Sequence, residues 1–189
     1  MPVDTPRGRA LLVRDPDGYL VEARQASRAA VAAAPSPGDV IETSIGITVS
    51  RRAPTLAFYE TLLGFHVKQT RTAGTAELRL NGLAGGRLTE TVTSVPGTSV
   101  AVVLSEFALP AGTPRPARRF DWRLQDVGSP QFQLEVSGLD ALIDRTKNAG
   151  YRFLSVGAKP IQRAFGRFVF AIDSDAVLVE FVEPAAGGR

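Results

Sequence analysis

The chain has 189 residues, of which 44% are hydrophobic and 22% are charged, a composition that supports a folded core and excludes a wholly disordered chain. It has no cysteine and a single histidine, His66, which excludes disulfide frameworks, thiol nucleophiles and sites that need two imidazoles from one chain. The net charge of +3 is spread without a basic stripe, so we expect no nucleic-acid partner. Because there is neither a long apolar stretch nor a secretory signal, we expect a cytoplasmic protein with no membrane partner.

Residues 1–25 are predicted to form a β-hairpin. The segment Asp15-Pro16-Asp17-Gly18 has the residue preferences of a type I turn and joins two apolar runs. Residues 26–39 start rich in alanine and end in Pro-Ser-Pro-Gly. This second segment is interpreted as a linker, with or without a short helix.

Residues 40–107 predict a strand, a helix and then several strands. Apolar and polar residues alternate from Ile41 to Ser50, which is typical of a half-buried strand. The segment Pro54–Leu63 carries Leu56, Tyr59, Leu62 and Leu63 at helical spacing and ends at Gly64. Further strands are expected at Phe65–Thr72, Ala76–Asn81, Gly86–Thr93 and Thr98–Glu106.

Residues 130–184 repeat this order, and residues 185–189 form a tail. The helix predicted over Leu139–Ala149 ends at Gly150 and has an apolar face made of Leu139, Leu142, Ile143 and Thr146. Strands are expected at Gln131–Val136, Tyr151–Val156, Phe165–Ile172 and Val177–Glu183. A helix on one face of each sheet leaves the other face free, so the pattern predicts α+β architecture with two open sheets joined into a cupped surface.

A second repeat links the two ends of the chain. The segment from Gly8 to Glu22 aligns without gaps on the segment from Gly166 to Glu180, an offset of 158 residues, with seven of fifteen positions identical. The identities lie on both strands and in the turn between them. We therefore interpret the N-terminal hairpin as a copy of the hairpin that closes the chain.

These segments resemble the vicinal oxygen chelate superfamily, which includes glyoxalases, bleomycin-resistance proteins and extradiol dioxygenases. The resemblance rests on the stretch from Ile45 to Phe65, on the helix that ends at Gly150, and on the closing hairpin from Phe170 to Glu180. It covers residues 40–184 as one domain and implies two βαβββ modules, 40–107 and 130–184, cupped around a pocket in a homodimer or a tandem pair. Residues 1–25 resemble the end of a preceding module.

The resemblance also implies a metal site built from the first and last strands of each module. Ser44 and Gln131 stand at the first-strand positions, which are usually histidine, and Glu180 matches the last-strand glutamate. These three side chains supply one charge, so we expect no tightly bound transition metal. If a divalent metal does bind, the candidate ligands are Gln131, Glu180 and Glu22, which holds the carboxylate position of the N-terminal hairpin. For the ligand positions, the last strand of the first module is taken as Ser99–Ser105, which offers no acid, and the nearest one, Glu106, is expected past its end.

The candidate ligand-binding residues are Ser44, Thr48, Gln131 and Gln133 on the free sheet face, with Arg119 and Trp122 before the second module. The two glutamines line a pocket or are simply solvated. The arginine–aromatic cluster binds a planar or anionic ligand or forms a covering loop.

We expect a protein that binds a small organic molecule without the usual metal. One alternative is a metal-dependent lyase, isomerase or dioxygenase with a non-standard ligand set. Another is a structural or regulatory domain that needs a second chain for activity.

Overall fold

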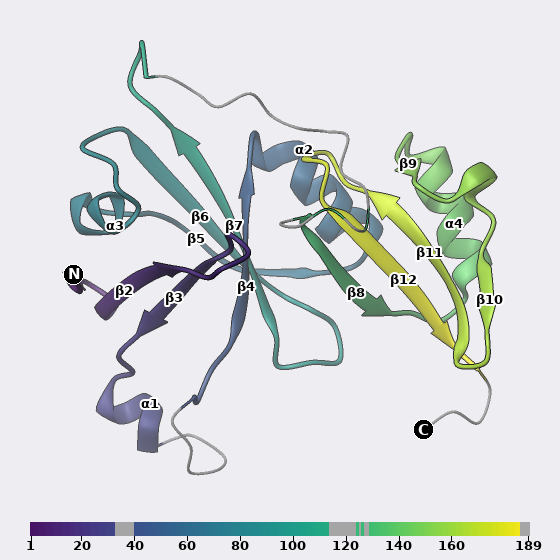
Figure 1. Cartoon of the computed structure of the whole chain (residues 1–189), viewed down its shortest axis with the longest axis horizontal. Helices are drawn as coiled ribbons and strands as arrows, with labels where there is room; N and C mark the ends of the chain where they lie inside the picture. Colours follow the sequence, from purple (N-terminus) through teal and green to yellow (C-terminus); the bar gives the residue numbers. More distant parts are fainter. Residues whose placement is uncertain (33–39, 114–123, 125, 127–128, 186–189) are drawn as a thin grey trace. The chain divides into compact units, whose positions relative to one another are not determined.

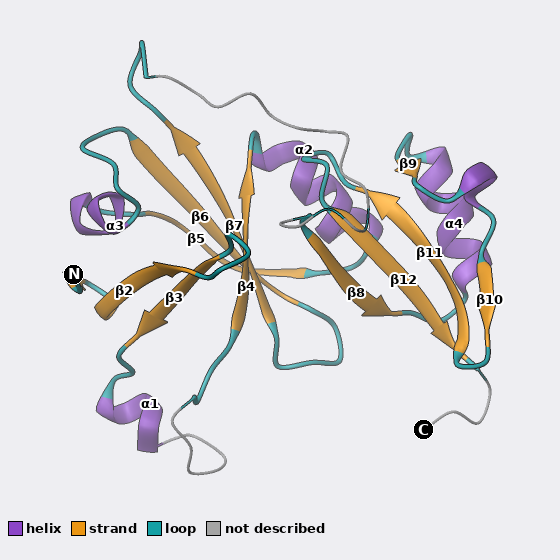
Figure 2. Ribbon diagram, viewed as in Figure 1, coloured by secondary structure: helices purple, strands orange, loops and turns teal. Residues whose placement is uncertain are grey.

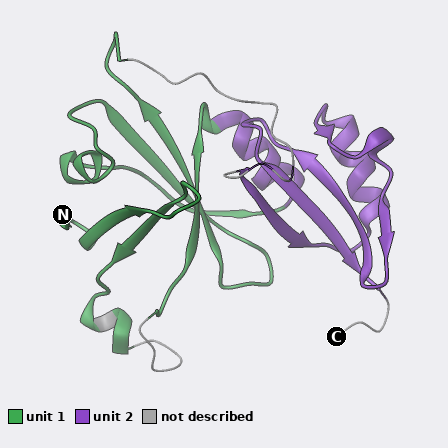
Figure 3. Ribbon diagram, in the orientation of Figure 1, with its two compact units in different colours: residues 1–52, 64–116 green, residues 53–63, 117–189 purple. Residues whose placement is uncertain are grey.

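The computed structural model describes residues 1–32, 40–113, 124, 126 and 129–185. The chain divides into two compact units (Figure 3): Met1–Arg52 with Gly64–Pro116, and Ala53–Leu63 with Ala117–Arg189. The described residues form three sheets with a few short helices, which confirms the predicted α+β class. None of the described helices is long and apolar enough to span a membrane.

The main sheet of the first unit has the strand order β4-β7-β6-β5. Strand β4 pairs in parallel with β7, and the other pairs are antiparallel. The alternation predicted for β4 is present at its end, because Ile47 and Val49 are buried while Thr48 is exposed. The strands are β4 (Ser44–Val49), β5 (His66–Thr72), β6 (Arg87–Ser94) and β7 (Ala101–Ala108).

The strand predicted at Ala76–Asn81 is wrong, because this segment is helix α3 (Thr75–Leu80). The Glu77 carboxylate accepts the Gly74 N–H at 2.8 Å and so satisfies a free amide at the helix start. Leu78 packs in a small core with Ala73 and Leu88. One capped turn with a single buried leucine is too short to show a helical period in the sequence.

The helix predicted at Pro54–Leu63 is confirmed as α2 (Arg52–Leu56) continued by the π-helical turn η1 (Ala57–Leu62). Its fully buried residues are Thr55, Phe58 and Tyr59, whereas Leu56 is only half-buried. The wider π-turn rotates the buried face away from the one predicted from a regular spacing. This helix groups with the second unit, although the strands on either side of it belong to the first.

The sheet of the second unit has the strand order β10-β11-β12-β8, with β9 paired to β11. Helix α4 (Leu139–Asn148) buries all four residues of its predicted apolar face. The strand predicted at Tyr151–Val156 is reduced to β9 (Arg152–Phe153), because Gly157, with φ 63°, turns the chain into the short helix η2 (Val156–Ala158). The other strands are β8 (Gln131–Glu135), β10 (Ile161–Arg163), β11 (Gly166–Ile172) and β12 (Leu178–Pro184).

The N-terminal residues form a third sheet, β1-β2-β3, within the first unit (Figures 1 and 2). Its strands are β1 (Val3–Thr5), β2 (Gly8–Arg14) and β3 (Leu20–Arg24), and the short helix α1 (Arg28–Ala32) follows. Each paired position has a counterpart 158 residues later in β10-β11-β12: Val13↔Val21, for example, matches Ala171↔Val179. The sequence repeat is therefore also a repeat of strand pairing, and it includes β1 and β10, which were not predicted.

Candidate functional site

A cavity of about 210 Å³ lies on the open face of the second sheet. Strand pairing puts Gln133, Glu180 and Phe170 side by side on β8, β12 and β11. Paired residues on neighbouring strands project from the same face, so these three side chains form one row across the sheet. The residues that line the cavity are Gln131, Phe132, Gln133, Phe170 and Glu180.

Among the described residues that line this cavity, Glu180 is the single ionisable one. Burial raises the pKa of its carboxyl above the usual range for glutamate. Within the part of the chain that the structure describes, no lysine or arginine forms an ion pair with it. A carboxyl of this kind accepts hydrogen bonds when charged and donates one when protonated.

An aromatic strip extends from the cavity along β11. The ring of Phe170 meets that of Phe168 edge to face at 6.0 Å, and Phe168 stacks on Phe165 at 5.8 Å. Phe165 is 58% exposed. The strip therefore offers a ring surface, beside the polar row, on which a planar molecule can lie.

A buried polar cluster stabilises the turn between β11 and β12. Phe170 lies on β11 and Glu180 on β12, on either side of this turn. Asp173 accepts the Tyr59 hydroxyl at 3.0 Å and the N–H groups of Asp175 and Val177 at 2.8 Å each. Burial raises the pKa of Asp173, and the bonds to its carboxylate only partly oppose this. Burial, followed by the nearby Asp173 charge, also raises the pKa of Tyr59.

Tyr59 was expected only on the apolar face of a helix, and no polar contact was expected for Tyr59 or Asp173. They are 114 residues apart, and one belongs to a helix while the other belongs to a turn. The one signal for Asp173 was its identity with Asp15 in the repeat.

The other predicted ligand-binding residues do not line this cavity. Ser44 and Thr48 are exposed residues of β4 in the first unit. Thr48 lies in a polar row, because it pairs with Ser105, which pairs with Glu90 on β6. Arg119 and Trp122 lie outside the described residues.

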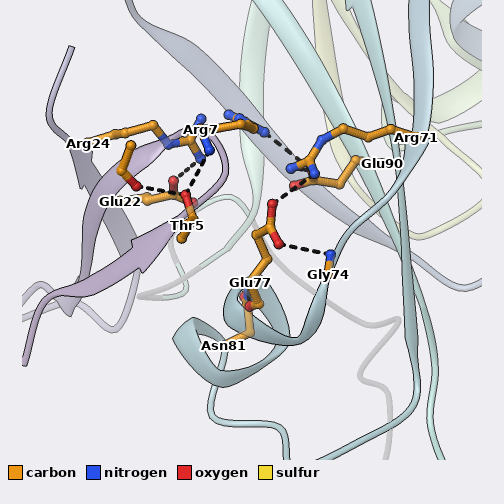
Figure 4. A network of polar contacts seen from close by, with 10 residues as sticks. Thr5, Arg7, Glu22, Arg24, Arg71, Gly74, Glu77, Asn81 and Glu90 are labelled. Carbon is orange, nitrogen blue, oxygen red and sulfur yellow. Dashed lines mark hydrogen bonds and ion pairs between the residues drawn. The ribbon is translucent and has the colours of Figure 1, made fainter. Parts of the chain in front are cut away.

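The third metal candidate, Glu22, belongs to an ion-pair network of the first unit (Figure 4). It pairs with Arg24, while Arg7 and Arg71 both reach Glu90. Burial raises the pKa of Glu22, and the Arg7 charge opposes the shift. The network comprises Arg7, Glu22, Arg24, Arg71, Glu77 and Glu90.

This network does not provide a metal site, because its three carboxylates are balanced by three arginines that hold their oxygens. Glu22 also does not line the cavity that holds Gln131 and Glu180. Across the described residues, no group of three or more acidic or histidine side chains is arranged to hold a metal ion. His66, on β5, forms part of no such group.

Strand β7 includes Glu106, as the strand predicted at Thr98–Glu106 does, so the narrower end at Ser105, which left this acid past the strand, is wrong. Glu106 pairs with Val49, whereas Thr48 pairs with Ser105. Successive residues of a strand point to opposite faces, so Glu106 faces away from Ser44 and Thr48. The first module therefore still presents no last-strand acid on its open face.

No protein-family model and no curated protein matches the sequence, but many solved structures match the fold. A glyoxalase family protein from Bacillus cereus superposes with a TM-score of 0.68 at 16% identity, over 79% of this chain and 97% of that one. An antibiotic binding protein from Streptomyces sp. CB03234 superposes with a TM-score of 0.53 at 14% identity, over 79% of this chain and 100% of that one.

A glyoxylase/bleomycin resistance protein/dioxygenase domain from Frankia sp. EAN1pec has a TM-score of 0.50 at 19% identity, over 79% and 100% of the two chains. These identities establish the fold alone. The chain has the fold of these glyoxalase and bleomycin-resistance proteins, which confirms the resemblance found in the sequence at the level of fold.

Proposed function

We propose that this protein, with its glyoxalase/bleomycin-resistance fold, binds a small planar organic molecule on the open face of the second sheet, without a transition metal. The observation that carries the proposal is the set of side chains on the open face at the cavity: two amides, one carboxyl and the ring of Phe170. Pockets for small molecules typically combine an apolar surface with a few convergent polar groups. The neighbour that is an antibiotic binding protein adds support from the fold.

The donor set of the cavity does not suit a transition metal. Gln131 and Gln133 offer neutral amide oxygens, and Glu180 supplies the only carboxylate. Iron, nickel and zinc sites in proteins favour imidazole and thiolate ligands, and neither lines this cavity. Burial raises the pKa of the Glu180 carboxyl, so a metal ion competes with a proton for this group up to a higher pH than it does for an ordinary glutamate.

The same residues suit an uncharged ligand with a polar edge. Phe170 and the strip beyond it contact the ring faces, while Gln131, Gln133 and Glu180 hydrogen-bond to carbonyl, hydroxyl or amide groups at the ligand edge. A fixed negative charge on the ligand is disfavoured, since Glu180 would repel it. We therefore expect neutral or cationic planar molecules to bind and anionic ones to be rejected.

Calorimetric titration of the full chain with a panel of planar aromatic antibiotics, beside non-aromatic ones of similar mass, tests the proposal. Replacing Phe170 or Gln133 with alanine should weaken a bound aromatic compound at least about tenfold, roughly 1.4 kcal/mol. Gln162→Ala is the matched control, because Gln162 is exposed on β10 and bonds only to nearby backbone oxygens. If the affinity for the bound compound stays unchanged in the Phe170 and Gln133 variants, the proposal is contradicted.

The alternative, a metal-dependent lyase, isomerase or dioxygenase, is favoured by one observation: Gln131 and Glu180 line the same cavity and offer two oxygen ligands. Elemental analysis of the purified protein decides between the two functions. Stoichiometric iron, manganese, nickel or zinc that is lost in the Glu180→Ala variant would replace metal-free binding with this alternative.

A further inference from the structure

The two hairpins of the repeat have the same backbone but different surroundings. In the closing hairpin, Asp173 accepts the N–H of Val177 at 2.8 Å, and in the N-terminal hairpin Asp15 accepts the N–H of Tyr19 at the same distance. Asp173 also accepts the hydroxyl of Tyr59. The two turns therefore have the same conformation, so any difference in burial comes from what packs against them.

That difference is large at the apolar positions. Four of those in the N-terminal hairpin are between 43% and 56% exposed, whereas their counterparts are at most 7% exposed. Val13 and Val21 pair across β2 and β3 and so share one face, and exposed apolar side chains gathered on one face are typical of an interaction site. The matched pairs are Val13 and Ala171, Tyr19 and Val177, Leu20 and Leu178, and Val21 and Val179.

Helices cover the closing hairpin on the face that Ala171 and Val179 share. Helix α4 packs against β12 through its apolar side, and η1 contributes Tyr59, which bonds Asp173 and stacks on Phe132 of β8. Within the described residues, the matching face of the N-terminal hairpin has no such helix, because Val13 and Val21 stay exposed.

Two polar side chains of the closing hairpin, Glu183 and Arg167, hold the start of α4. The N-terminal hairpin has partly matching residues at the same positions. Glu183 accepts the N–H groups of Gly138 and Leu139 at 2.8 and 3.0 Å, and Arg167 bonds Asp140 in the first turn of α4 at 3.0 Å. The repeat puts Arg9 at the position of Arg167 and Gln25 at the position of Glu183.

A cavity of about 300 Å³ lies at this end of the N-terminal hairpin. Arg9 and Gln25 both line it, so the place that the first turn of α4 occupies in the closing hairpin is hollow here. The basic charge of the lining comes from Arg9, because the guanidinium of Arg7 is paired with Glu90. The residues are Pro6, Arg7, Gly8, Arg9, Gln25, Ala26 and Ser27.

We propose that the N-terminal hairpin docks an amphipathic helix from a partner polypeptide. The apolar side of that helix covers Val13 and Val21, and its acidic first turn enters the basic cavity and pairs with Arg9. Helix α4 shows the chemistry that fits: aliphatic residues at intervals of three and four, and an acid in the first turn. The α4 helix of this chain, or of a second copy, is already packed on its own β12, so α4 itself is not the proposed occupant.

The test uses a helix-stabilised peptide with the sequence of residues 138–150, titrated into the isotope-labelled full chain and followed by amide NMR. We expect shifts confined to the hairpin and its cavity, residues 6–27, which Val21→Lys abolishes. The Arg9→Glu substitution should weaken binding at least about tenfold, and a peptide with Asp140→Lys should recover that loss on the Arg9→Glu protein. Val156→Lys is the matched control, since Val156 is a 92% exposed residue of the second unit.

If the hairpin amides do not shift at about 1 mM peptide, the dissociation constant is above that concentration and too weak for a functional complex. This result would overturn the proposal. So would a failure of the charge swap to restore binding. Sedimentation velocity tests whether a second copy of the chain occupies this surface instead. A dimer that dissociates in the Val21→Lys variant would assign the surface to a second copy. Far-UV circular dichroism of each variant confirms that it is folded. None of these readouts depends on the cavity of the second sheet.

Discussion

The N-terminal and closing hairpins have the same backbone conformation but differ in how deeply their side chains are buried. Comparing them distinguishes the residues that set the local conformation from those that pack into a core. Both have glycine at the start of the first strand, with φ of 116° at Gly8 and 146° at Gly166, and both have an aspartate that closes the turn. These shared residues serve the local conformation. Burial differs, since the N-terminal hairpin has Ala23 where the closing hairpin has the fully buried Phe181. Local geometry therefore persists in this hairpin without the packing that accompanies it in its counterpart.

The largest difference between the hairpins should come from their glycines. A Cβ on residue 166 would lie 2.2 Å from the Glu183 carbonyl oxygen, and one on residue 8 would lie 2.7 Å from the Gln25 oxygen. Gly166→Ala should therefore destabilise the second unit by about 3 kcal/mol or more. Hydrogen exchange at the α4 amides measures this, and Gly8→Ala should leave those amides unchanged.

The turn aspartates should differ next. Asp173→Ala removes the acceptor of a buried hydroxyl and of two backbone amides, so we expect a loss of about 3 kcal/mol in the free energy of unfolding by urea. Asp15→Ala, in a half-exposed turn, should cost about 1 kcal/mol. Equal losses at the two sites would show that the surroundings of the turns do not matter.

The Tyr59 hydroxyl should account for part of that gap. Tyr59→Phe keeps the ring stack on Phe132 but loses the bond to Asp173, for an expected cost of about 1.5 kcal/mol. Tyr151→Phe is the control, because the Tyr151 hydroxyl bonds the Pro54 carbonyl at a longer 3.4 Å and should cost less. A double-mutant cycle with Asp173→Asn reports the coupling, and additive losses would exclude a direct Tyr59–Asp173 bond.

The smallest effect should be a pH dependence specific to the closing hairpin. Burial raises the folded-state pKa of Asp173 above its ordinary value of 3.8, so the folded protein binds that proton more tightly than the unfolded chain does. The penalty of the buried charge is present above the folded pKa and disappears as pH falls through it toward 3.8. Wild type should therefore gain stability relative to Asp173→Asn on acidification, as urea titrations at several pH values would show.

The sequence predicted the parts of this fold that local periodicity controls. Helix α4 has a regular apolar spacing and a terminal glycine, so both its extent and its buried face were predicted. Helix α3 was missed, since its identity depends on the Glu77 cap. The buried face of η1 was predicted only in part, with Tyr59 but without Phe58, because a π-turn breaks the regular helical spacing.

The candidate site was predictable only in part. Gln131, Gln133 and Glu180 could be placed on the first and last strands of a module, where the fold puts an open face. Phe170 lies at the cavity because the register of β11 and β12 pairs it with Glu180. The Tyr59–Asp173 hydrogen bond joins residues 114 positions apart. Neither relation leaves a local pattern in the sequence.

The assignment of residues 53–63 to the second unit has a consequence for the order of synthesis. This helix is made before any strand of the sheet that it covers, while the strands that flank it in sequence belong to the other unit. A fragment of residues 117–189 would leave Phe132 without its ring partner and the buried Asp173 without its hydroxyl donor. Segments of the two units therefore alternate along the chain, and no single cut of the polypeptide separates them into two complete units.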